Sequence, residues 1–211
     1  MSDKNMNNNS SSIPIGRMLR SDTTGFTFGC NLPEPDVPLF GDFVKAPAQQ
    51  GKIDIIGVIY NIFIEDDLLV KQLITVPQLP ETYIQDQRNN RQVPIEVSVL
   101  SIGYVYNDTI IYSLPPQPPV TLDYINTCAK NDIVQFTKST DYLTLILNSN
   151  EPSIDELIIT TLRRAAEARS IEEQGLFLFE CGKKLARLLS HDPYKLDSIL
   201  RRLKVNYEQN I

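Results

Sequence analysis

The residues that could do acid–base or metal chemistry are few in this chain, and they are scattered along it. His191 is the single histidine of 211 residues, so neither a His–carboxylate triad nor a histidine-based metal site is indicated. It lies in the run Ser190-His191-Asp192, but a catalytic triad is assembled in space, and adjacency in the sequence does not predict one. The acidic run Glu65–Asp67 lacks the spaced ligands of a cation-binding loop and is better explained as a solvated turn.

The cysteines and the glycine–lysine pairs also lack the spacing of reactive sites. Cys30, Cys128 and Cys181 lie far apart, which is typical of small buried side chains in a reducing compartment. A phosphate-binding P-loop has the pattern G-x-x-x-x-G-K-[S/T]. Neither Gly51-Lys52 nor Gly182-Lys183 has the glycine upstream or the hydroxyl residue after the lysine. We therefore predict a protein that is not an enzyme, with no catalytic, cofactor-binding or metal-binding residue.

Cations gather near the end of the chain. Between positions 183 and 204 they are Lys183, Lys184, Arg187, Lys195, Arg201, Arg202 and Lys204, against two carboxylates. Such a cluster fits an acidic protein surface or a phosphate backbone. Solvated helix faces with cations near the helix C-termini are the plainer explanation. We predict Lys183, Lys184, Arg187, Arg201, Arg202 and Lys204 as partner-binding residues.

Composition limits the class of protein. The net charge of −6 and the isoelectric point of about 4.9 argue against a bulk nucleic-acid binder. No apolar run approaches the ~18 residues of a membrane span. Residues 1–12 are polar, so we expect a disordered tail rather than a secretory signal. Together with the cysteine usage, these features favour a cytoplasmic protein.

Short β-branched and aromatic runs, separated by glycine and proline, dominate residues 13–128. Strands are predicted at 13–19, 26–30, 43–45, 53–64, 95–106, 110–112 and 120–127. Gly57, inside a long apolar strand, predicts a bend or bulge, and Asn107-Asp108 predicts a hairpin turn. Residues 68–91 are expected to be a connecting excursion with a helical turn near 81–88. The proline run Leu114–Pro119 is expected to be a rigid connector, with a polyproline II ligand as the alternative. This pattern indicates a small closed or nearly closed antiparallel β-barrel.

The hydrophobic period changes to that of helices after about residue 130. A connector over 129–152 is predicted to hold short helical pieces at 132–136 and 142–147. Three helices follow over 153–207: one to about Ser170, one over 172–189, and a third that starts at Asp192-Pro193. Ser153 and Glu156 have the spacing of a capping box. Strands first and helices last make the fold class α+β.

Four segments of the barrel region resemble the HAS-barrel family, the small β-barrel shared by HerA-type translocases and the head of the rotary ATP synthase. They are Ile15–Arg17, Ser21–Phe28, Phe40–Val44 and Ile56–Tyr60. The proline run and the helical tail look like the stand-alone HAS-barrel proteins of cyanobacteria. The resemblance covers about residues 13–128 and, less specifically, 150–205.

The resemblance implies a role in subunit contacts and in partner docking on ring assemblies. Motor activity does not carry over, because the P-loop is missing. We therefore predict a non-enzymatic adaptor or assembly module that docks on a protein partner, with a HerA-like or other ring-shaped ATPase as the expected class. Self-association is left open. The alternative is a nucleic-acid-associated accessory protein that uses the basic C-terminal helices.

Overall fold

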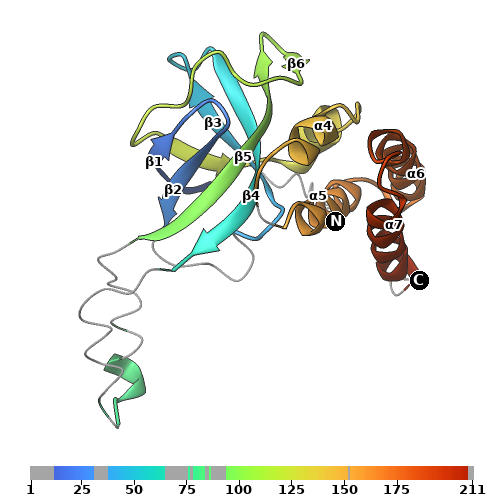
Figure 1. Ribbon diagram of the computed structural model, residues 1–211. Helices are drawn as coiled ribbons and strands as arrows, with labels where there is room; N and C mark the ends of the chain where they lie inside the picture. The colour runs from blue at the N-terminus through green and yellow to red at the C-terminus, as the bar shows by residue number, and fades with distance from the viewer. Residues whose placement is uncertain are drawn as a thin grey trace, which may run out of the picture.

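The chain folds into a β-barrel with helices stacked on one side of it (Figure 1). The computed structural model describes residues 12–30, 38–64, 76, 78–83, 86, 94–151 and 153–208. Residues 1–11 of the predicted tail and most of the predicted excursion at 68–91 lie outside the described residues; residues 81–83 of the predicted helical turn are helical.

Seven antiparallel strands form the sheet: β1 (Pro14–Ser21), β2 (Gly25–Cys30), β3 (Phe43–Ala48), β4 (Ile53–Phe63), β5 (Ile95–Tyr106), β6 (Thr109–Ile111) and β7 (Tyr124–Thr127). Their order is β2-β1-β7-β3-β4-β5-β6, and β2 also pairs with β5. This last pairing closes six strands into a barrel and leaves β6 outside on β5. The predicted closed barrel is confirmed.

Apolar residues that alternate along the strands fill the barrel. Phe28, Val44, Ile55, Ile59 and Ile125 are fully buried there. Since successive side chains of a strand point to opposite faces, the other face of β3, β4 and β5 is free to bind the helices.

The bulge predicted at Gly57 is confirmed. The register between β4 and β5 shifts between Ile56 and Gly57. A Cβ atom on Gly57 would lie 2.4 Å from Val99 Cγ1 and 2.8 Å from the Leu100 carbonyl oxygen. A side chain at this position would therefore collide with β5, so the close approach of the two strands requires glycine.

The conformations of two turns are explained by the residue types at their positions. Asn107 and Asp108 have φ of 46° and 60°, which is the conformation of the tight hairpin turn predicted between β5 and β6. Between β1 and β2, one Asp22 carboxylate oxygen accepts hydrogen bonds from the Thr24 amide at 2.7 Å, the Thr24 hydroxyl at 2.6 Å and the Gly25 amide at 3.0 Å.

The predicted last strand at 120–127 is too long. Residues 120–123 form a turn instead, because Leu122 has a φ of 71°, which a strand cannot contain. Before it, Pro115 and Pro119 of the predicted connector are buried, and the Pro119 carbonyl accepts a hydrogen bond from the Ser21 hydroxyl at 2.7 Å. The proline run thus packs against the barrel.

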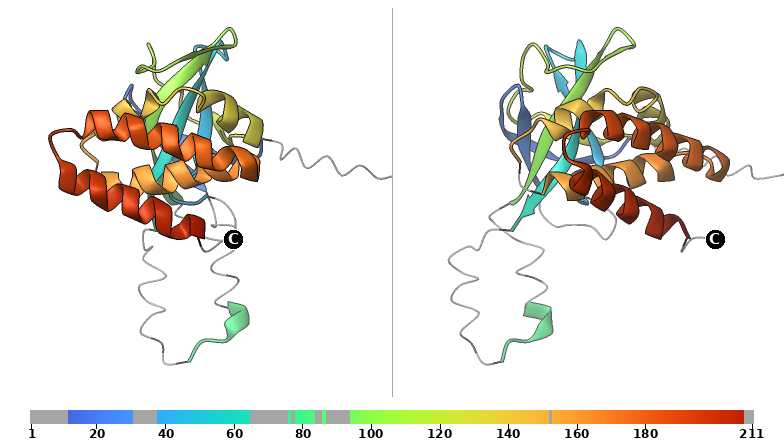
Figure 2. Two further views of the ribbon diagram at one scale, coloured as in Figure 1. Left: turned by 90° about the vertical axis from the view of Figure 1, so that its right-hand side faces the viewer. Right: turned by 45° about the vertical axis from the view of Figure 1, so that its right-hand side comes forward.

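The helices are α3 (Lys130–Phe136), α4 (Tyr142–Leu147), α5 (Ile154–Glu167), α6 (Ile171–Leu188) and α7 (Pro193–Glu208). A second apolar cluster joins the outer face of the barrel to them, with Phe43 and Ile102 beside Leu143 and Leu162. In Figures 1 and 2, α4 and α5 lie next to the barrel, and α6 and α7 form a further layer. Figure 2 shows α6 and α7 running in opposite directions from a short turn.

Both predicted helix starts are correct in position, but only one of the two predicted side-chain caps forms. Asp192 precedes Pro193, and its carboxylate accepts a hydrogen bond from the Lys195 amide at 3.0 Å, as expected of an N-cap. Ser153 makes no side-chain capping hydrogen bond, because its φ of 65° is left-handed rather than extended. The partner of Glu156 is Arg202 of α7. In addition, α5 ends at Glu167, earlier than predicted.

Arg169 fixes the start of α6. Its guanidinium donates to the Ala165 carbonyl at 2.5 Å and to the Thr137 hydroxyl at 2.7 Å, and it lies 3.7 Å from the centre of the Phe177 ring. The segment between α5 and α6 is therefore held from three elements at once.

Candidate functional site

The residues first considered for chemistry are not assembled into a reactive centre in the part of the chain that the structure describes. His191 is exposed in the turn between α6 and α7, and Asp192 beside it serves as the N-cap of α7. Glu65–Asp67 lie outside the described residues. Among the described residues, no three His, Cys, Asp or Glu side chains are grouped closely enough to hold a metal ion. None of the described helices has the length and apolar character needed to cross a membrane.

The three cysteines are free thiols. Cys30 and Cys181 are buried and Cys128 is partly buried. Burial raises the pKa of all three, that of Cys181 to about 12. The thiols are therefore protonated near neutral pH, and a thiolate nucleophile is not favoured. This agrees with their interpretation as small buried side chains.

A polar hollow of about 310 Å³ opens beside β1, β2 and β5. Tyr60 in its wall is hydrogen-bonded with Ser98 and Glu151, and burial raises the pKa of its phenol. Of its other charged groups, Arg20 pairs with Glu96 at 2.6 Å, and Asp22 accepts the turn hydrogen bonds described above. These groups are engaged in structural contacts, so the hollow supports no particular reaction.

Most of the predicted partner-binding cations are engaged in ion pairs within the chain. Lys184 contacts Asp141 at 2.8 Å and so ties α6 to the segment before α4. Arg202 pairs with Glu156 and joins α7 to α5. Lys195, also in the cation cluster, contacts Asp155 at 3.0 Å. These three pairs hold the outer helices onto the inner ones.

The remaining cations lie along the outer helices. Lys183 pairs with Glu180 at 2.9 Å, and Arg201 pairs with Asp197 at 2.5 Å, each within one helix. Arg187 lies in the last turn of α6, where a cation interacts favourably with the helix dipole. Of the six predicted residues, Lys183 and Lys204 line one groove, from α6 and α7 respectively.

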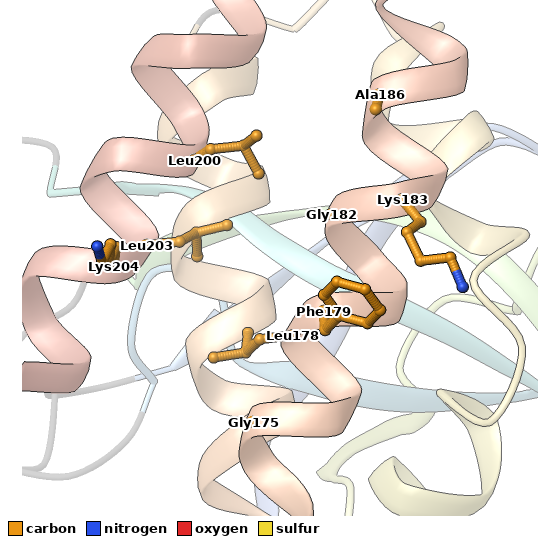
Figure 3. A pocket seen from close by; sticks show the side chains of 9 residues that line it. All are labelled: Gly175, Leu178, Phe179, Gly182, Lys183, Ala186, Leu200, Leu203 and Lys204. Carbon is orange, nitrogen blue, oxygen red and sulfur yellow. The ribbon is translucent and has the colours of Figure 1, made fainter.

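That groove runs between α6 and α7 and has a volume of about 500 Å³. Its lining is Gly175, Leu178, Phe179, Gly182, Lys183 and Ala186 from α6, and Leu200, Leu203 and Lys204 from α7. Figure 3 shows Leu178, Leu200 and Leu203 between the two helices. Apart from the two lysines, the walls are apolar or bare backbone. We call this surface the helical groove.

The helical groove exists because α6 is apolar on more than one side. Phe177, Cys181 and Leu185 are buried against the inner helices. The second side carries the groove residues, and Phe179 there is 62% exposed. Leu176, at the edge of that side, is 67% exposed. A solvated helix normally has one apolar stripe, so the second stripe makes this surface a candidate binding site. The sequence signal for it is the run Leu176–Phe179, since four consecutive apolar residues cannot all face one core.

A second exposed apolar surface lies on the outside of the barrel over β1 and β7. The Arg17 guanidinium lies 3.8 Å from the centre of the Tyr124 ring, is hydrogen-bonded to the Tyr124 hydroxyl, and donates to the Leu122 carbonyl at 3.0 Å. Leu122 is 69% exposed, and Tyr124 and Leu19, which lies two positions after Arg17 on β1, are also exposed. We call these four residues the barrel patch.

In comparisons with known proteins, no family model and no curated relative matches this chain. The resemblance to the HAS-barrel family therefore rests on the residues of the sequence alone and stays a prediction.

Proposed function

We propose that this protein is a non-enzymatic adaptor or assembly module that docks on a protein partner through the barrel patch. The observation that supports it most is the stack of Arg17 on Tyr124, with exposed Leu122 hydrogen-bonded to the same guanidinium and exposed Leu19 further along β1. Tyrosine and arginine are the residue types that contribute most to protein interfaces, and leucine adds apolar area.

The barrel holds this surface rigid before binding. Arg17 lies opposite Tyr124 in the pairing of β1 with β7, and the hydrogen bond to Leu122 fixes the guanidinium. Side chains that are already ordered lose less conformational entropy when a partner binds. Closure of the barrel also removes free strand edges from its six strands, so the side chains, rather than an open edge, are the means of recognition.

The expected partner class is a ring-shaped ATPase, HerA-like or other. This part of the proposal rests on the HAS-barrel resemblance, because such barrels serve at subunit contacts of ring assemblies. A cytoplasmic location, expected from the cysteine usage, belongs to the same proposal.

The nucleic-acid alternative receives less support. At least five of the seven cations between 183 and 204 are in ion pairs with described carboxylates of this chain, which lowers the positive field available to a phosphate backbone. No described contact specifically favours it.

The test is capture from native extract with the full chain as bait, followed by mass spectrometry. We expect the wild type to retain a P-loop ATPase, and Leu122→Glu or Tyr124→Ala to lose it. Tyr106→Ala is a matched control, since Tyr106 is an exposed aromatic residue of β5 outside the patch. Equal retention by all four proteins would overturn docking through the patch. Loss of retention only after nuclease treatment, with a salt-dependent binding to DNA or RNA, would favour the alternative.

A further inference from the structure

The exposed side of α6 is complementary to itself when the helix is reversed. Consider two copies of α6 packed antiparallel about a two-fold axis that runs between the two helices, at the level midway between Glu180 and Cys181. Phe179 of one copy then lies opposite Gly182 of the other. The same register places Gly175 opposite Ala186, while Leu178 and Lys183 lie at one level on the two flanks of the helix pair. The six residues that α6 contributes to the helical groove thus lie in one symmetric interface.

This register matches bulky side chains with space. Phe179 projects from α6 and is mostly exposed, while Gly182 leaves bare backbone one turn further along the same side. The nearest atom to a Cβ built on Gly182 is Leu200 Cδ2, at 3.5 Å, so the groove floor is a methyl group of α7. An aromatic ring entering from a second copy would meet Gly182 and Leu200. This is the arrangement of a knob in a hole.

The charged residues at the two ends of α6 are also complementary in an antiparallel pair. Its first turn carries Glu172 and Glu173, and its last turn carries Arg187. An antiparallel pair brings the acidic start of one helix beside the basic end of the other, on both sides of the axis. A parallel pair would place like charges together. Complementary charges at the flanks of a helix pair select its orientation.

We propose that two copies of this chain associate by antiparallel packing of α6, with Phe179 of each copy in the helical groove of the other. The interface is isologous, so every contact occurs twice and the assembly closes at two copies. Lysine stems flank the apolar centre: the methylenes of Lys183 extend along its edge while the ammonium stays in water. This association uses a different surface from the barrel patch and does not depend on the proposed partner.

The test is the mass of the full chain in solution, measured by sedimentation equilibrium over a range of concentrations. The wild type is expected to be a dimer. Phe179→Ala removes the knob and Gly182→Leu fills the hole, so each should raise the dimer Kd by at least about tenfold. Tyr194→Ala is the matched control, because Tyr194 is an exposed aromatic residue of α7 that does not line the groove. Circular dichroism and a thermal melt check that each variant folds.

A charge exchange tests the orientation. Glu172→Lys alone and Arg187→Glu alone should each weaken the dimer by several fold, because each places like charges side by side. The double variant should recover most of the dimerisation, since the contact between positions 172 and 187 is restored with its signs exchanged while Glu173 keeps its charge. Additive weakening in the double variant contradicts the antiparallel register. A wild type that stays monomeric at about 100 µM overturns the proposal and leaves the groove to another occupant.

Discussion

The barrel and the outer helical layer bury their apolar residues in different ways. The barrel closes on itself, and its interior residues, such as Phe28 and Ile55, are fully enclosed by its own strands. The outer layer has two helices, which bury one side of α6 on the inner helices and leave the other side open as a groove. A closed sheet completes its core within one chain, whereas a two-helix layer has a free face that a further layer must cover. Substitutions in the two regions should therefore change the free energy of unfolding by different amounts and, in some cases, in opposite directions.

The largest contrast is expected between the two sides of α6. Leu185→Ala should lower the free energy of unfolding by about 2–5 kcal/mol, because Leu185 is fully buried and the cavity cannot collapse completely. Phe179→Ala should change it by less than about 0.5 kcal/mol in the monomer, since the side chain lies at the surface. Urea unfolding at low protein concentration measures both values. A large loss for Phe179→Ala would mean that the exposed side belongs to the core of the single chain.

The next contrast lies within the barrel. Gly57→Val should destabilise the fold by about 3 kcal/mol, because its side chain would meet Val99 and the backbone of Leu100. Gly51→Val should cost roughly 1–2 kcal/mol, since nothing lies within 4 Å of a Cβ at this position and only the φ of 78° opposes it. The midpoints of thermal unfolding should rank the wild type above the Gly51 variant and that above the Gly57 variant. Equal midpoints for the two variants would show that the strands relax around Gly57.

A stabilising substitution is expected in the helical layer. Gly182→Ala places a methyl group at ordinary contact distance from Leu200 and removes the conformational freedom of glycine from a helix interior. It should raise the free energy of unfolding by about 0.5–1 kcal/mol, as measured by urea unfolding of the monomer. A destabilised variant would contradict the groove as an open space at this position.

The smallest effect is expected at the ion pair of Lys184 with Asp141. The hydrogen bond from Lys184 lowers the pKa of the Asp141 carboxyl, so the folded state favours the charged form. The stabilisation is thus present above the ordinary carboxyl pKa and is lost as the pH falls through the lowered value. Asp141→Asn should lower stability by about 0.5 kcal/mol at pH 7, because the Asp141 carboxylate is largely exposed and water screens the pair. Chemical unfolding of both proteins should give converging values as the pH falls below the ordinary carboxyl range. A constant difference at acid pH would assign the effect to the asparagine side chain instead.

Local patterns predicted the elements that are determined by local chemistry. Alternation gave the strands, Gly57 gave the bulge, and Asp192-Pro193 gave the start of α7. The capping box failed at Ser153, because a capping sequence acts only when the backbone before the helix is extended. The backbone conformation at Ser153 depends on tertiary packing, and the spacing of Ser153 and Glu156 carries no information about it.

The candidate site was harder to predict than the fold. The cation cluster was visible in the sequence, but its carboxylate partners include Asp141, Asp155 and Glu156, which lie 43, 40 and 46 positions away. Pairings over such separations depend on tertiary packing. The helical groove is visible in the sequence only as the apolar run Leu176–Phe179. Whether the side chains of such a run are buried or exposed depends on how many helices cover α6.

The order of the layers determines where the two exposed surfaces face. In Figure 1, β1 and β2 lie at one end of the molecule and α6 and α7 at the other, with α4 and α5 between them. Two copies joined through α6 would therefore carry their barrel patches outward, at opposite ends of the assembly. A partner that repeats the same site around a ring could then be held at two points, and the second contact would form at the effective concentration set by the span of the pair. Weak binding at each barrel patch would then be sufficient for tight binding of the dimer to the partner. Dissociation of the dimer into single chains would release it.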